Sequence, residues 1–266
     1  MNNSHREKWQ LKMFQQSLKK KIKLKHLNLF LEDLNNKICL AITSGDNTGA
    51  INYHIYKQGG EWITAELDPE NLNTMKDVID RPILHIMPAH SCFKDNIFDT
   101  ILILDALEHV IDDIGFLKEM KRILKINGLL IVTVPTGDQR LFINKLRSSL
   151  GIKPEFYGHV RYGYTKEELE DILKETGFNI KKRGSYSGAF TELLEFTINY
   201  LYSNYISSQK NHRGRNQIIP TAEKELGLAF KIYTVIYPLF YAISYLDNIF
   251  FNGGEYAVTV SGIKEG

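Results

Sequence analysis

The sequence is poor in cysteine and in net charge, and each shortage excludes a class of protein. Its 266 residues include only two cysteines, Cys39 and Cys92. Their separation fits neither a metal-binding nor a redox motif, so the sequence predicts buried thiols in a reducing compartment rather than a disulfide framework. The formal net charge is only +2, which argues against a nucleic-acid-binding protein.

Proline and a leading apolar run are also lacking. Only 7 prolines and 19 glycines accompany a hydrophobic content of 43%, so the composition is typical of a folded domain rather than of a disordered chain. The opening residues MNNSHREKWQ contain no apolar run, and the sequence therefore predicts no secretory signal peptide and a cytoplasmic location. A chain of this length can form one domain with its own buried core, together with an additional segment.

A basic amphipathic segment begins the chain and is predicted to form a unit of its own, residues 1–36. Leu11, Phe14, Leu18 and Ile22 recur at helical spacing within a predicted helix from Arg6 to Asp33, and five lysines lie between residues 19 and 25. Two interpretations stay open. The helix packs on the domain with a solvated face, or it attaches to an anionic membrane surface as a peripheral anchor.

Short apolar runs alternate with helical stretches from residue 37 to residue 187. The predicted strands are residues 38–43, 62–66, 83–87, 98–105, 128–134 and 178–182, and the predicted helices are residues 49–57, 69–78, 114–124 and 165–176. Thr165 and Glu168 form a capping-box pattern at the start of the last helix. The alternation predicts an α/β fold, a doubly wound and mostly parallel sheet buried on both faces.

The C-terminal part is predicted to be a helical insertion, residues 188–254, followed by a return to the core with a last strand, residues 255–266. The insertion contains helical patterns over residues 189–207 and 222–251. Its apolar stretch from Ile232 to Leu246 is interrupted by Pro238 and is shorter than the roughly 20 residues of a spanning helix. Tyrosines recur there every four residues, at Tyr233, Tyr237, Tyr241 and Tyr245. This stripe fits a core or homodimer interface, an aromatic acceptor pocket or a membrane-interface surface.

The residues that follow the predicted strands are the candidates for a ligand site, because ligands bind beyond the carboxyl ends of strands in such sheets. A glycine-containing turn, Thr43 to Gly49, follows the first strand. Glu66 ends the second strand, at a spacing typical of an acid that binds ribose hydroxyls. The segment Asp105 to His109 follows the fourth strand. The order of these features along one chain is more specific than any one of them.

Two stretches resemble class I S-adenosylmethionine-dependent methyltransferases. The first is FDTILILDALEHVIDDIGFLKEMKRILKINGLLIVTVP, residues 98–135, and the second is GHVRYGYTKEELEDILKETGF, residues 158–178. The resemblance implies S-adenosylmethionine as cofactor and a seven-stranded sheet whose last strand is antiparallel. A classical dehydrogenase fits less well, because the first turn lacks the GxGxxG pattern.

The resemblance also assigns residues to the cofactor. The first turn corresponds to the family's glycine-rich motif beside the methionine part, Glu66 to the ribose-binding acid, and Met87 to a position near the adenine where Asp is often found. The assigned positions are Thr43, Ser44, Gly45, Asp46, Asn47, Gly49, Glu66, Leu67, Met87, Asp105, Ala106 and Leu107. The first motif is degenerate, since Ala41 replaces its usual acid and Thr43 a usual glycine.

The predicted reaction is methyl transfer to a small-molecule, glycan or lipid-like acceptor at oxygen. A hydroxyl acceptor needs its proton removed, and His109 and His159 are the candidate bases. The histidines and scattered acids give no recognisable metal-binding set, so no metal is predicted. The alternative is a catalytically degenerate methyltransferase-like protein that binds a partner or a membrane through its helical section.

Overall fold

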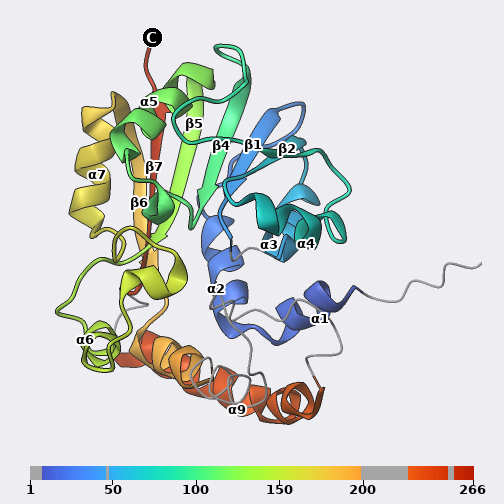
Figure 1. The fold of residues 1–266 in the computed structure, drawn as a ribbon, viewed down its shortest axis with the longest axis vertical. Coiled ribbons are helices and arrows are strands. Elements are labelled where there is room, and N and C mark those ends of the chain that lie inside the picture. Colours follow the sequence, from blue (N-terminus) through green and yellow to red (C-terminus); the bar gives the residue numbers. More distant parts are fainter. Residues whose placement is uncertain (1–7, 46–47, 199–226, 251–254) are drawn as a thin grey trace, which may run out of the picture.

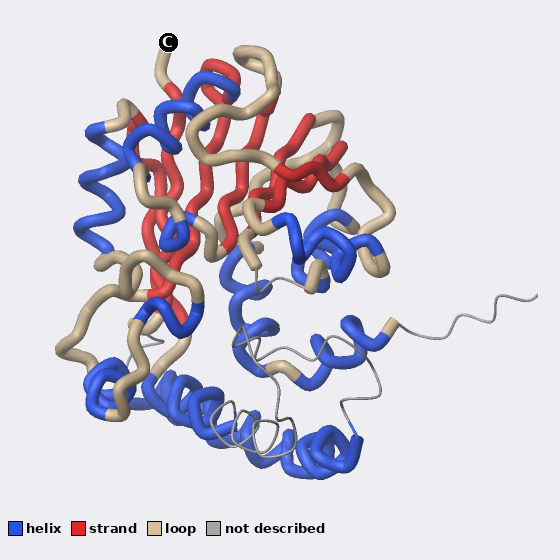
Figure 2. Tube along the Cα trace, viewed as in Figure 1, coloured by secondary structure: helices blue, strands red, loops and turns tan. Residues whose placement is uncertain are grey.

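The protein has a seven-stranded sheet with helices on both faces (Figures 1 and 2). The computed structural model describes residues 8–45, 48–198, 227–250 and 255–266. The strand order is β3-β2-β1-β4-β5-β7-β6, with β1 Ile38–Thr43, β2 Glu61–Glu66, β3 Ile83–His85, β4 Phe98–Leu104, β5 Leu124–Pro135, β6 Phe178–Tyr186 and β7 Ala257–Lys264. The pairs from β3 through β5 are parallel, and β7 runs antiparallel between β5 and β6. The predicted α/β sheet and its antiparallel last strand are confirmed.

The helices of the α/β core follow the predicted alternation with small differences. They are α3 Ala50–Tyr56, α4 Leu72–Lys76, α5 Asp113–Ile123, α6 Phe142–Ser149 and α7 Lys166–Glu175, with 3₁₀ turns η1 Pro69–Asn71, η2 Leu107–His109 and η3 Pro154–Tyr157. The capping box at Thr165 is present, because its side chain accepts from the Glu168 N–H and the Glu168 carboxylate accepts from the Thr165 N–H. Helix α6 was not predicted from the sequence.

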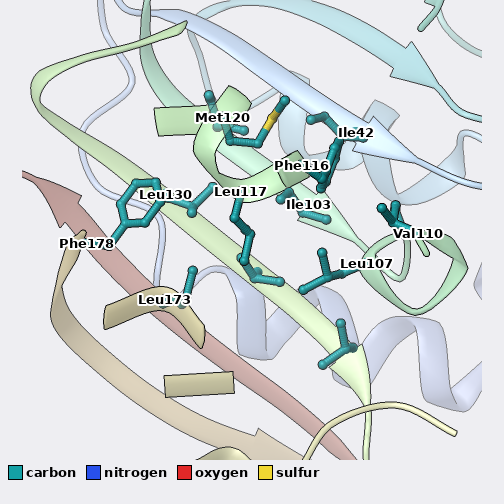
Figure 3. Packing of buried hydrophobic residues seen from close by; sticks show 14 of the residues in the cluster. Ile42, Ile103, Leu107, Val110, Phe116, Leu117, Met120, Leu130, Leu173 and Phe178 are labelled. Carbon is teal, nitrogen blue, oxygen red and sulfur yellow. The ribbon is translucent and has the colours of Figure 1, made fainter. Parts of the chain in front are cut away.

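The core lies in two layers, one on each face of the sheet. In β4, Ile101 and Ile103 belong to the layer under α5 and α7, and Leu102 and Leu104 to the layer under α3 and α4. Figure 3 shows Ile103 among Phe116, Leu117 and Met120 of α5 and other residues of the first layer. A strand buried on both faces must be apolar at successive positions, which is why residues 98–104 were recognisable in the sequence.

The N-terminal segment differs from the single helix predicted for residues 6–33. It forms two helices, α1 Trp9–Gln16 and α2 Leu18–Leu27. The break is at Ser17, whose backbone is extended (ψ 106°) and whose side chain accepts a hydrogen bond from the Lys20 N–H. Serine competes with the helix by capping the next one, so the single-helix prediction was wrong. Phe14 and Leu27 are buried in the layer under α3.

The two C-terminal helices pack against each other, and Figure 1 shows α9 under the sheet in that view. Residues 189–198 are helical, and α9 is Gly227–Phe250. The buried Asp247 carboxylate of α9 accepts from the backbone N–H of Phe190 (2.8 Å) and Thr191 (3.0 Å), and so caps the helix over residues 189–198. The remainder of the predicted first helix lies outside the described residues. In the part of the chain that the structure describes, every helix is too short or too polar to span a bilayer.

The tyrosine stripe of α9 is present for the residues whose side chains are described. Tyr237 and Tyr241 have ring centroids 6.4 Å apart, and Tyr241 and Tyr245 have them 5.7 Å apart. The Lys21 ammonium group of α2 lies over the Tyr237 ring, 5.0 Å from its centroid. One end of the stripe therefore meets the N-terminal helices, whereas Tyr241 and Tyr245 are 48% and 57% exposed.

A buried histidine should make the fold sensitive to acid. His26 of α2 packs between Phe30 and Tyr186, with ring centroids 5.0 and 4.8 Å away. Burial, and secondarily the charge of Lys182, lowers the pKa of His26 to about 4. Between pH 6.5 and 4 the unfolded chain binds a proton that the folded chain does not, so the free energy of unfolding falls as the pH falls. We expect His26→Leu to flatten this fall in thermal melts, and the exposed His85→Ala to leave it unchanged.

Candidate functional site

The turn after β1 is ordered by the carboxylate of Glu66 at the end of β2. Glu66 is fully buried. Its Oε2 accepts from Thr43 Oγ1 (2.8 Å) and Asn71 Nδ2 (3.1 Å), and its Oε1 accepts from the N–H groups of Gly45 (3.0 Å) and Asp68 (2.8 Å). A carboxylate offers about four acceptor positions, so these four donors fill it. The buried Glu66 carboxylate therefore fixes the conformation of the turn after β1.

This network explains one departure of the first motif. The Thr43 side chain is buried and its hydroxyl donates to Glu66, so its Cβ lies on the side of the carboxylate. Gly45 follows with φ +53°, in the left-handed region that favours glycine. Asp46 and Asn47, which were predicted to contact the cofactor, lie outside the described residues.

Asp68 is a candidate that the sequence analysis did not assign. Its Oδ1 accepts from the Glu70 N–H (3.0 Å) and caps η1. Its Oδ2 lies 3.7 Å from the point where a Cβ on Gly45 would stand, so this oxygen faces the first turn. Burial lowers the pKa of His109, and the charge of Asp68 opposes that shift only in part.

Some of the other predicted cofactor residues lie near the carboxyl ends of the parallel strands, and others lie in the core. Ser44 is buried, and Gly49 has φ +79° where α3 begins. Leu67 donates its N–H to the Thr43 carbonyl (3.0 Å). Met87 is 66% exposed just beyond β3. Ala106 and Leu107 are fully buried in the layer under α5, so their side chains belong to the core.

Asp105 meets a lysine from the N-terminal helices. It has φ +44°, and its N–H donates to the Thr133 carbonyl (2.9 Å), which places it directly beyond β4. Its carboxylate contacts the Lys23 ammonium group of α2. Burial lowers the pKa of Lys23 to about 7, with the charge of Lys19 as the next cause, while carboxylates nearby favour the charged form. Helix α2 therefore covers the carboxyl end of β4 with a cation.

The structure brings His109 and His159 together. Their rings are in edge-to-face contact with centroids 4.6 Å apart. His109 Nδ1 lies 3.0 Å from the Gly158 carbonyl oxygen, which can only accept, so Nδ1 carries the proton and Nε2 keeps its lone pair. The Val160 N–H also donates to the Glu108 carbonyl (3.0 Å).

Arg161 is the residue that joins these two segments. Its guanidinium donates to the carbonyl oxygens of Val110 (2.9 Å) and Ile111 (3.0 Å) and pairs with the Asp113 carboxylate. Tyr164 Oη donates to the same carboxylate (2.7 Å). The planar guanidinium binds several acceptors at once and so fixes the loop in one orientation.

Both histidines are held in their neutral form. Burial lowers the pKa of His109, against the Gly158 hydrogen bond and the Asp68 charge. Burial also lowers the pKa of His159 to about 3, with the charges of His109 and Lys19 as further causes. Neutral imidazoles keep a lone pair for a proton or a ligand at physiological pH.

A cavity of about 70 Å³ opens beside His159. Its lining combines aromatic and cationic side chains, among them Lys19, Arg147, Tyr157 and Tyr256. Lys19 Nζ and Arg147 Nη2 contact the fully buried Glu192 carboxylate at 2.5 and 2.8 Å. Such a volume holds a few waters or the reacting end of a larger molecule.

Comparisons with known proteins agree with this architecture. Residues 42–132 match the family model of the methyltransferase domain. An uncharacterized protein of Methanocaldococcus jannaschii, MJ1123, is 37% identical over 90 residues, which are 34% of this chain and 42% of that protein. The chain thus spans less than half the length of this relative.

Solved structures are similar over almost the whole chain. A Thermotoga maritima SAM-dependent methyltransferase superposes with a TM-score of 0.58 and 18% identity, covering 96% of this chain and 94% of that one. A Haloferax volcanii protein solved with the Trm112 methyltransferase activator gives a TM-score of 0.58 and 13% identity, covering 97% and 94%. These likenesses establish the fold.

The described residues fit S-adenosylmethionine by their chemistry. The cofactor carries hydroxyl groups, an ammonium group and a carboxylate. Asp68 and Asp105 supply carboxylates at this edge, Lys23 supplies an ammonium group, and the backbone of Gly45 is open to approach because a Cβ there would meet only Asp68 Oδ2, at 3.7 Å.

Proposed function

We propose that this chain is a class I methyltransferase that uses S-adenosylmethionine as cofactor and transfers the methyl group to an oxygen atom of its acceptor; its fold and the methyltransferase-domain match over residues 42–132 support this proposal. The observation that carries the proposal is the convergence of the turn after β1, Asp68 and Asp105 at one edge of the sheet, with His109 and His159 beyond them. The cofactor, when bound, supplies an electrophilic methyl group on a sulfonium sulfur.

The chain's own residues bind, orient and exclude water. Asp68 accepts hydrogen bonds from hydroxyl groups, because Glu66 is filled by its internal donors. Lys23 and Asp105 bind the charged groups of the methionine part, and the buried face of α2, which carries Lys23, helps to keep water from the site. These assignments refine the expectation that Glu66 itself contacts ribose.

The acceptor oxygen lies beside the histidine pair in this proposal. His159 lines the cavity and contacts His109, so of the two candidate bases His159 is the one placed to accept the proton of the acceptor hydroxyl, which must leave for in-line transfer. His109 packs against the His159 ring and helps to orient it. The cavity takes only the reacting end of an acceptor, which suits a glycan or lipid-linked molecule whose remainder stays outside. The exposed Val235, Leu239 and Ile249 of α9 offer an apolar surface for that remainder or for a membrane.

A second candidate is a methyltransferase-like module without catalysis. The observation in its favour is the altered first motif, where Ala41 is fully buried in the apolar layer under α3 and supplies no carboxylate. The Haloferax volcanii neighbour was solved with an activator protein, and a module of this kind would act through a comparable protein contact.

Titration calorimetry with S-adenosylmethionine tests the proposal. We expect saturable binding by the wild-type chain and a loss of more than about tenfold in affinity in Asp68→Ala, because a hydrogen-bonded charged group is removed from the binding edge. The exposed Asp80→Ala serves as the matched control and should bind like the wild type. Absence of binding by the wild type at millimolar cofactor would favour the module without catalysis.

A further inference from the structure

Glu108, His109 and His159 form a cluster that could not be found from the sequence alone. One ligand atom from each residue lies within 4.8 Å of the other two. Glu108 and His109 are adjacent in η2, but His159 follows η3 on a different segment. Two imidazole nitrogens and one carboxylate oxygen are the donor set of many catalytic zinc sites, which leave one coordination position open.

We propose that Glu108, His109 and His159 bind one divalent first-row transition-metal ion, with zinc as the best fit. Imidazole and carboxylate together suit such ions rather than calcium or magnesium, which prefer oxygen ligands. This inference goes beyond methyl transfer and stands on the donor set and its geometry.

The distances are close to those that an ion requires. Two ligands each about 2.1 Å from one tetrahedral ion are about 3.4 Å apart, so a separation of up to 4.8 Å must shorten by up to about 1.4 Å through side-chain movement when the ion binds. The two histidines already stand at 80° to one another, so their ring planes do not stack.

The surroundings of His109 are those of a metal ligand. A ligating histidine usually donates its other ring N–H to a carbonyl or carboxylate, which fixes the tautomer. His109 does this with the Gly158 carbonyl at 3.0 Å. Gly158 has φ +72°, a left-handed conformation that turns the chain so that its carbonyl reaches His109 and the next residue, His159, returns to the same place.

The position of the cluster gives the ion a role beside the acceptor. His159 is shared between the cluster and the cavity, so an open coordination position would face the molecule in that cavity. A hydroxyl oxygen bound to the ion loses its proton more easily than a free hydroxyl. In the loaded protein the histidines would then act through the ion.

Metal titration of tag-free protein tests this inference. Protein treated with a chelator and desalted is titrated with Zn²⁺ by calorimetry and with Co²⁺ by visible absorption, in the absence of S-adenosylmethionine. We expect one ion per chain, and more than about a tenfold loss of Zn²⁺ affinity in His159→Ala. The exposed His90→Ala is the matched control and should bind like the wild type.

The readouts separate this inference from the proposed function. His159 is only partly buried, and a thermal melt checks that His159→Ala is folded; Glu108→Gln, which keeps the shape of a buried side chain, provides a second variant. Zn²⁺ binding that is absent, or that survives in both variants, overturns the metal site. Cofactor binding by the metal-free protein is measured separately, so failure of one proposal does not decide the other.

Discussion

Glu66→Ala should destabilise the protein and also weaken cofactor binding. The substitution removes the buried acceptor of four donors, two of them the backbone N–H groups of Gly45 and Asp68. Leaving such donors buried costs about 1–3 kcal/mol each before water relieves part of it, so we expect a fall of about 3 kcal/mol in the free energy of unfolding. Urea denaturation measures this value.

The cofactor effect of Glu66→Ala has a separate physical reason. The turn after β1 loses the group that orders it, so part of the binding free energy is used to order the turn when the cofactor binds. The affinity for S-adenosylmethionine should therefore fall by more than about tenfold. Glu61→Ala, an exposed acid at the start of the same strand, should change neither quantity. Unchanged calorimetric affinity in folded Glu66→Ala would contradict the role of Glu66 as organiser of the turn.

Glu192→Ala should destabilise the protein by about 3–5 kcal/mol, which is typical when one partner of a buried ion pair is removed. The Glu192 carboxylate is fully buried and contacts Lys19 of α2 at 2.5 Å and Arg147 of α6 at 2.8 Å. It also accepts from Ser187 Oγ at 2.8 Å. The variant would leave two cations together without their counter-charge, and the N-terminal helices would lose their attachment to α6.

The pH dependence of the same contact gives a second measurement. Burial alone would raise the pKa of Glu192, but the charges of Lys19 and Arg147 lower it to about 2. A carboxyl with a depressed pKa stabilises the folded state above its unfolded value and loses that contribution as the pH falls toward 2. Denaturation at pH 7 and pH 3 should therefore show a smaller difference for Glu192→Ala than for wild type. Asp171→Ala, 77% exposed, should stay within about 0.5 kcal/mol of wild type.

Local patterns in the sequence were sufficient for the α/β core. The doubly buried strands β1 and β4 are continuous apolar runs, and α7 begins at a capping box that two local hydrogen bonds complete. Each of these features depends on neighbours along the chain, which is why the alternation and the α/β class could be predicted. The resemblance to methyltransferases supplied the antiparallel position of β7.

Long-range contacts decided the rest. The side chains of Ala106 and Leu107 are buried in the core, and Glu66 points inward because the Thr43 hydroxyl of the neighbouring strand donates to it there. The helix break at Ser17 is an exception, because its cap on the Lys20 N–H is a local contact. His109 and His159 meet because the Arg161 guanidinium ties its loop to the carbonyl groups after η2. The sequence by itself determined which segments form the sheet and which polar residues follow its strands. Only the tertiary structure decided which of those residues share a site, because hydrogen bonds and ion pairs between distant segments set the direction of each side chain.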